Sequence, residues 1–436
     1  MSPRGAPEDG GGARAALSRP DFRRLWIAHG VSQAGDGLTW LALVLTVNRL
    51  TGSAAMIATL SVVLTVPQLG LGLFAGVMAD RWDRRRTMIV ADLARGALVL
   101  GFLLIRDPGD LWLLYLLGFL QAIVGVFFNP ARAALTPGLV APAELLGANS
   151  LLQTTQVVGG LIGTALAGVL VPLAGSGWPA FVLDAASFLV SAGCVAGIRA
   201  GGIAATRADA PSIEEGRGIL RELLDGLGLV FGSRVLLAVL ISFAVASLGT
   251  GAVSVLFVPF LVNTLHVPAA SVALARGAQV AGLLLGGAWA ARSGLSRSSA
   301  LLVGGGLAGI GLATVLLGVA PDLAFVLACL LLLGLFAMPM QSATNAILQR
   351  RTPNSLLGRV ESAVDTMLLA VMMVSMGWAG LVADRVGIRE VFFVAGALCV
   401  AGGAVGWVML TRALAAEPDA DDRTAETGWN GLSRRE

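Results

Sequence analysis

Charged residues are scarce in this chain, and histidine and tyrosine are almost absent. Only 13% of the 436 residues are charged and 56% are hydrophobic, whereas a soluble domain has about 25% charged residues. Two His and one Tyr leave little material for histidine-based catalysis, and three Cys at unrelated spacing indicate neither disulfides nor a zinc site. The composition therefore excludes a water-soluble globule, and we expect no enzyme activity, no cofactor and no metal.

Long apolar stretches alternate with short polar breaks along most of the chain. Residues 1–21 lack the apolar core of a signal peptide and are predicted to be a disordered cytoplasmic tail. The following stretches of about 18–28 residues are long enough to cross a hydrocarbon core of about 30 Å. They predict an all-α integral membrane protein with twelve transmembrane helices, at approximately 24–48, 54–78, 87–105, 110–131, 145–171, 179–199, 235–262, 269–291, 299–319, 322–347, 357–382 and 389–411.

The positions of arginine predict the orientation of these spans. Lysine does not occur, so arginine supplies all 30 positive side chains, and the net charge of +3 is no sign of nucleic-acid binding. With both termini on one side of the membrane, that side carries 24 arginines and the other carries four. Because short arginine-rich loops remain in the cytoplasm, we expect both termini to be cytoplasmic in a multi-pass protein of the plasma (inner) membrane.

The sequence divides into two related halves. Leu146 recurs as Leu357 at an offset of 211, and Arg81 recurs as Arg292 at the same offset. Such a repeat is typical of transporters whose site lies between two halves, so we expect two pseudo-symmetric six-helix bundles. The predicted domains are an N-terminal bundle at 22–199, a cytoplasmic linker at 200–234 with an amphipathic helix over 219–231, a C-terminal bundle at 235–411 and a cytoplasmic tail at 412–436.

A compact motif follows the second apolar stretch. Gly76, Asp80, Arg81, Arg84 and Arg85 form the pattern GxxxDRxxRR, in which the glycine permits close helix packing and the arginines anchor the cytoplasmic end. This pattern resembles the loop between the second and third helices of the major facilitator superfamily. The resemblance implies the major facilitator fold, usually working as a monomer, and a gating role for these five residues. The alternative is an arginine cluster that only sets orientation.

Three small residues recur along the fifth span. Residues 159–168, which include Gly159, Gly163 and Gly168, are expected to place small residues along one helix face, and this segment resembles the glycine-rich motif of drug antiporters in the same superfamily. That motif normally has proline where Thr164 stands. Close packing against another helix explains the glycines about as well.

Further segments narrow the resemblance to one branch of the superfamily. Residues 128–132, 148–151 and 183–188 are similar to segments of the branch that contains macrolide exporters, the enterobactin exporter and multidrug pumps. The resemblance covers about residues 20–412, and it implies export of small molecules.

Two carboxylates within spans are candidates for proton coupling. Asp36 lies some twelve residues into the first span, about 18 Å deep, between Gly35 and Gly37. A carboxylate in such surroundings can bind and release a proton as water access alternates; the alternative is a structural Asp capping a broken helix. Asp365 in the eleventh span is the second candidate, and an ordinary salt bridge with Arg359 is its alternative.

Three further charged residues lie in spans that face outward in the family and are predicted to be structural. Asp92 and Arg95 stand three residues apart and can neutralise one another. Asp184 has no partner close to it in the sequence.

The predicted substrate cavity is apolar and aromatic with a few amides, which suits amphiphilic molecules. Its candidate residues are Gln33, Trp40, Gln121, Phe127, Asn129, Phe243, Phe257, Phe336, Gln341 and Asn345. The sequence as a whole favours a secondary active transporter in the lipid bilayer, with proton-coupled efflux of drugs, macrolide-like compounds or siderophores by alternating access. An importer or a flippase of lipid-like solutes with the same fold is the alternative, and a membrane enzyme or sensor fits less well.

Overall fold

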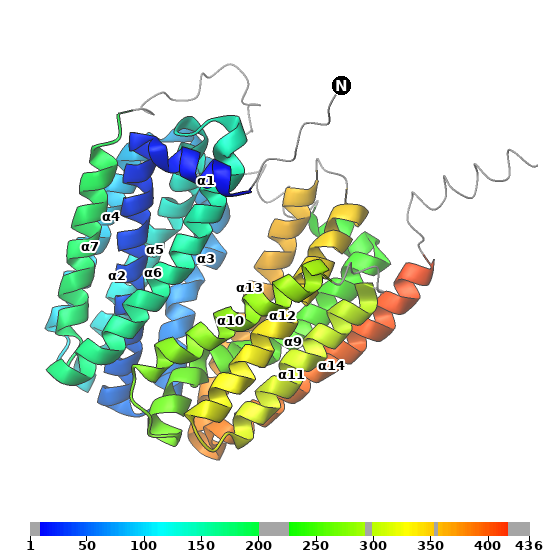
Figure 1. The fold of residues 1–436 in the computed structure, drawn as a ribbon. Coiled ribbons are helices and arrows are strands. Elements are labelled where there is room, and N and C mark those ends of the chain that lie inside the picture. The colour runs from blue at the N-terminus through cyan, green and yellow to red at the C-terminus, as the bar shows by residue number, and fades with distance from the viewer. Residues whose placement is uncertain (1–8, 200–225, 293–298, 353–355, 417–436) are drawn as a thin grey trace, which may run out of the picture. The chain divides into compact units, whose positions relative to one another are not determined.

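The computed structural model describes residues 9–199, 226–292, 299–352 and 356–416, apart from the side chains of residues 9–11, 73, 74 and 76–81. Within these ranges the chain forms twelve helices of eighteen or more residues and no strand (Figure 1). Eleven of the twelve are long and apolar enough to span a membrane. The remaining one contains the first predicted span and is less apolar, because it carries Asp21, Arg23, Arg24, Asp36 and Arg49.

The chain divides into two compact units, the first of which contains the N-terminal helices. This unit is Met1–Ser212 with Leu261–Leu274, so it includes the segment around the short loop between the seventh and eighth spans. Its helices are α1 (Asp9–Ser18), α2 (Pro20–Thr51), α3 (Ala54–Arg81), α4 (Arg84–Gly101), α5 (Leu111–Leu135), α6 (Leu145–Ala174) and α7 (Trp178–Ala196).

The second unit contains the C-terminal helices. It is Ile213–Phe260 with Ala275–Glu436. Its helices are α9 (Arg234–Pro259), α10 (Ser271–Arg292), whose first turn belongs to the first unit, α11 (Ser299–Val319), α12 (Leu323–Arg351), α13 (Leu357–Val386) and α14 (Ile388–Ala416). Helices dominate because the hydrocarbon core offers no water, so each backbone N–H and C=O needs a partner within its own segment.

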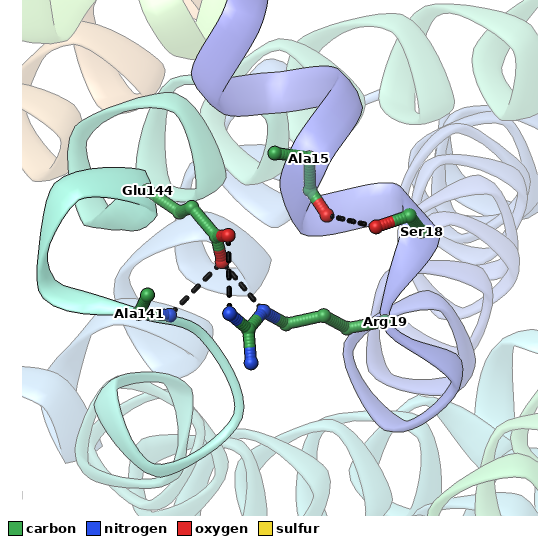
Figure 2. A network of polar contacts seen from close by, with 5 residues as sticks. All are labelled: Ala15, Ser18, Arg19, Ala141 and Glu144. Atoms are coloured by element: carbon green, nitrogen blue, oxygen red, sulfur yellow. Dashed lines mark hydrogen bonds and ion pairs between the residues drawn. The ribbon is translucent and has the colours of Figure 1, made fainter.

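The N-terminal segment differs from the predicted disordered tail. Residues 9–18 form α1, and Ala16 is fully buried in a core that also contains Phe22 and Leu25. Figure 2 shows Arg19, between α1 and α2, reaching Glu144 in the turn before α6: the Nε–Oε2 distance is 2.6 Å, and Ala141 N donates to the same carboxylate. The prediction failed because α1 is held by contacts with residues more than a hundred positions away.

The other predicted boundaries shift by smaller amounts. Helix α14 continues to Ala416, five residues beyond the expected end of the C-terminal bundle. Residues 226–232 are helical and overlap the end of the segment 219–231, for which an amphipathic helix is predicted. Its first part, 219–225, lies outside the described residues, as do residues 417–436 of the predicted tail.

Candidate functional site

An ion pair links two helices inside the first unit. Arg95 on α4 donates from Nη2 to Oδ1 of Asp36 on α2, and Gln33, one turn before Asp36, donates to Oδ2 at 3.4 Å. The Arg95 guanidinium also lies 4.4 Å from the centre of the Phe188 ring on α7. The Arg95 side chain is 12% exposed and the Asp36 side chain is 28% exposed. The structure therefore gives Asp36 a cation, and Arg95 bonds across helices rather than to Asp92.

Two more carboxylates are buried in the same unit, and hydroxyl groups hold them. Asp184 on α7 accepts hydrogen bonds from Thr39 at 2.5 Å and from Ser187 at 3.1 Å. Asp92 on α4 accepts one from Ser191 at 2.6 Å. Both aspartates are fully buried. The first unit therefore contains three carboxylates around one arginine, which we call the carboxylate cluster: Asp36, Asp92, Asp184 and Arg95.

Glycine makes this cluster sterically feasible. A Cβ on Gly35 would collide with Oδ1 of Asp184 and with the Ser187 hydroxyl, so only glycine lets the polar groups of α7 come so close to α2.

A carboxylate taken out of water without a cation of its own is costly when ionised. An arrangement with more carboxylates than cations can hold a proton, which is the chemistry that a proton-coupled transporter needs.

The glycines of the fifth span lie where α6 packs against α2. A Cβ on Gly163 would stand 2.8 Å from the backbone nitrogen of Leu38, and one on Gly159 would stand 3.1 Å from Cβ of Gln33. The expected single face does not extend to Gly168, which lies half a helical turn from Gly159 around α6: its added Cβ would meet Cα of Ala270 at 2.6 Å. This close approach holds Gln33 and Asp36 on a helix whose position is fixed by backbone contact.

The loop motif is described only in part. Gly76, Asp80 and Arg81 lie in the last turns of α3, and their side chains are outside the described residues. Arg84 donates to the Ala134 carbonyl at 3.0 Å, at the end of α5, and Arg85 donates to the Val195 carbonyl at 3.1 Å, at the end of α7. These two arginines connect the start of α4 to the C-terminal ends of α5 and α7.

A cavity in the second unit gathers several of the predicted substrate residues. It has a volume of about 380 Å³ and is lined by Phe243 from α9, by Gln341 and Asn345 from α12, and by Glu361 and Asp365 from α13. Gln341 donates to Asn345 at 3.4 Å. We name it the α9/α12/α13 cavity. Glu361 was not among the predicted site residues; it lies one helical turn before Asp365, on the same face of the helix, and lines the cavity with it.

The other predicted cavity residues are dispersed. Phe336 lines a different, apolar groove with Trp289 and Pro339, because it stands about half a helical turn away from Asn345 around α12. Phe127 stacks on Trp82 with ring centres 5.8 Å apart. Of the rest, Phe257 and Gln121 are buried, Trp40 is half-buried and Asn129 is exposed.

The comparisons with known proteins agree with this architecture. The chain matches the sequence profile described as Major Facilitator Superfamily over residues 25–278 and 272–435. It is 24% identical to macrolide efflux protein A of Streptococcus pyogenes, over 87% of this chain and 93% of that protein. It is 27% identical to the enterobactin exporter EntS of Citrobacter koseri, over 79% of this chain and 80% of that protein.

Solved structures resemble the chain in fold. A bacterial homologue of the human lysosomal transporter Spinster aligns with a TM-score of 0.70 at 14% identity, covering 95% of this chain and all of that one. A bacterial homologue of the iron transporter ferroportin aligns with a TM-score of 0.69 at 17% identity, covering 90% and 99%.

Proposed function

The chain belongs to the Major Facilitator Superfamily and is a multi-pass membrane transporter, and we propose that it exports amphiphilic small molecules in exchange for protons. The carboxylate cluster carries this proposal. Three carboxylates share one arginine inside an apolar bundle, so a proton that enters the cluster changes which carboxylate Arg95 neutralises.

We assign the proton-carrying role to Asp36. Its side chain is 28% exposed, whereas Asp92 and Asp184 are fully buried, so water reaches Asp36 most easily. When Asp36 takes up a proton its bond to Arg95 weakens, and α2 is then free to shift against α4. Release of the proton restores the ion pair. Alternating access needs a step of this kind, in which protonation changes the balance between two states.

Export is supported by the names of the two relatives and by the lining of the α9/α12/α13 cavity. The two relatives above are named as a macrolide efflux protein and as an enterobactin exporter. The cavity combines an aromatic ring, aliphatic side chains, amides and carboxylates, which suits a molecule with both apolar and polar parts. We propose Asp365 as a second group for proton coupling, because it lies on this cavity.

We also propose how the protein sits and moves in the membrane. The excess of arginine on one side supports a plasma-membrane protein with both termini in the cytoplasm. Gly76, Asp80, Arg81, Arg84 and Arg85 are proposed as the gating motif, since Arg84 and Arg85 join the start of α4 to the ends of α5 and α7. A monomer is the proposed working unit.

Transport in everted membrane vesicles tests the direction and the coupling together. We expect vesicles that contain the protein to accumulate an amphiphilic fluorescent dye when an inward-acidic proton gradient is imposed, because the cytoplasmic face points outward in these vesicles. The variant Asp36→Asn should lose gradient-driven accumulation. An importer, or a flippase of lipid-like solutes, remains the alternative, and it predicts that the gradient depletes the dye or leaves it unchanged.

A further inference from the structure

The α9/α12/α13 cavity is built from one stripe of each of three helices. Helix α12 contributes Gln341, Thr344, Asn345 and Leu348, and α13 contributes Glu361, Val364, Asp365 and Leu368. Both sets follow the i, i+3, i+4, i+7 spacing that defines one helix face. Val239 and Phe243, four residues apart on α9, complete the lining. The cavity therefore has an acidic wall from α13, an amide wall from α12 and an apolar wall from α9.

Among the residues that the structure describes, no cation pairs with the two carboxylates on the acidic wall. Glu361 and Asp365 are both exposed, and within the described residues neither forms an ion pair. Like charges four residues apart on a helix repel one another and destabilise it. The arginines at the end of α12, Arg350 and Arg351, line a separate cavity with Gly287 and Ala290. Negative charge is thus concentrated in this cavity.

The internal repeat shows that the acidic wall is particular to the second half. At the offset of 211, Glu361 corresponds to Ser150 and Asp365 corresponds to Thr154. Both corresponding residues are neutral, and the Thr154 hydroxyl is satisfied by the carbonyl of Ser150. The corresponding helix of the first half, α6, therefore forms without a carboxylate at either position. The fold does not require the two carboxylates on α13.

We propose that this cavity binds lipophilic organic cations, with the positive group between Glu361 and Asp365 and the apolar part against Phe243 and Leu368. This inference rests on the proposed export function and names its substrate class. A bound cation removes the repulsion between the carboxylates and gains two charge-assisted contacts. A volume of about 380 Å³ accommodates a compound of drug-like size. An anionic compound of the same shape is repelled.

Two probes that share a shape and differ in the sign of their charge test this proposal. Tetraphenylphosphonium is a permanent cation, and tetraphenylborate is its anionic counterpart. Equilibrium binding of each is measured on the purified full-length protein in lipid nanodiscs. We expect the wild-type protein to bind the cation at least about ten-fold more tightly than the anion, because the anion meets two carboxylates.

Variants locate the binding in this cavity. Glu361→Gln and Asp365→Asn should each weaken cation binding about ten-fold, while Glu361→Asp and Asp365→Glu, which keep the charge, should retain most of it. Glu390→Gln removes a carboxylate from α14 outside the cavity and should leave binding unchanged. Thermal unfolding of each variant verifies that it is folded.

Each outcome separates this inference from the export proposal. Equal binding of the two probes, no binding of the cation, or wild-type affinity in folded Glu361→Gln and Asp365→Asn proteins overturns the cation site, even if the vesicles export a dye. Cation binding that depends on both carboxylates supports the site, even if proton-driven export fails.

Discussion

Arg95 on α4 bonds to Asp36 on α2, a residue 59 positions earlier in the chain, while its guanidinium rests on the Phe188 ring of α7. One side chain thereby connects three helices of the first unit. Arg95 does not bond to Asp92, which lies one helical turn before it on α4. Asp92 instead accepts a hydrogen bond from Ser191 on α7. The positive charge of the carboxylate cluster therefore lies against α2, and protonation of Asp36 can make or break its bond to that helix.

The pairing of Asp36 and Arg95 predicts a coupled effect on stability. Arg95→Gln should destabilise the protein by about 2–3 kcal/mol, because it leaves a largely buried carboxylate without its cation. The double variant Asp36→Asn with Arg95→Gln should recover part of this loss. Thermal unfolding of the purified proteins measures both effects. Strictly additive losses would mean that the two side chains do not interact.

The packing of α6 on α2 predicts opposite results at two neighbouring glycines. A Cβ on Gly163 would enter the backbone of α2, whereas one on Gly160 would meet no heavy atom within 4 Å. Gly163→Ala should therefore separate the helices and lower the yield of folded protein, and Gly160→Ala should be tolerated. Size-exclusion profiles of the detergent-solubilised proteins compare the two. Equal tolerance would contradict the close approach at Gly163.

The pair of Arg19 and Glu144 predicts a pH-dependent contribution to stability. The hydrogen bond from Arg19, followed by that from the Ala141 N–H, lowers the pKa of the Glu144 carboxyl below its ordinary 4.5. A lowered folded-state pKa stabilises the fold at pH values above the unfolded value, and this contribution disappears as the pH falls through the folded value. Arg19→Gln should therefore be less stable than the wild type near neutral pH.

The difference between these two proteins should shrink as the pH drops below about 4.5. It should be small throughout, since Arg19 is exposed and solvent screens the pair. Thermal unfolding across the acidic range measures it, with Arg14→Gln on α1 as a control that retains the Arg19–Glu144 bond. A difference that does not change with pH would show that Arg19 acts through packing alone.

The separation of Phe243 from Phe336 predicts that only one of them contacts substrate. Phe243 lines the α9/α12/α13 cavity, and Phe336 lines the apolar groove on another face of α12. Phe243→Leu should raise the KM for dye export about three- to ten-fold through the loss of aromatic contact, while Phe336→Leu should leave KM unchanged. The reverse pattern in vesicle transport would place the substrate in the groove.

Much of the architecture could be predicted from hydropathy alone. A segment that must satisfy its own backbone in lipid becomes a helix, so the twelve apolar stretches correspond to twelve long helices, of which eleven meet the length and composition expected of a membrane span. The helix without that match, α2, carries charged residues near both ends and Asp36 of the carboxylate cluster near its middle. The short α1 could not be predicted, because its stability comes from contacts with residues near Glu144.

The candidate site depended far more on tertiary structure. The sequence alone determined which side chains are exceptional: a carboxylate between two glycines, a pair of acids one helical turn apart, and several glycines along the fifth span. It also determined, through helical periodicity, that Glu361 and Asp365 share a face. Local spacing fixes such relationships because they lie within one helix.

Only the packing of the helices decided which of these groups meet. Spacing favoured a bond between Asp92 and Arg95, yet the three-dimensional arrangement gives Arg95 to Asp36 and gives the two buried aspartates to hydroxyls on α2 and α7. Partners on different helices are chosen by how closely the backbones approach and by how the helices rotate about their axes, and neither quantity is written in the spacing of residues along one segment.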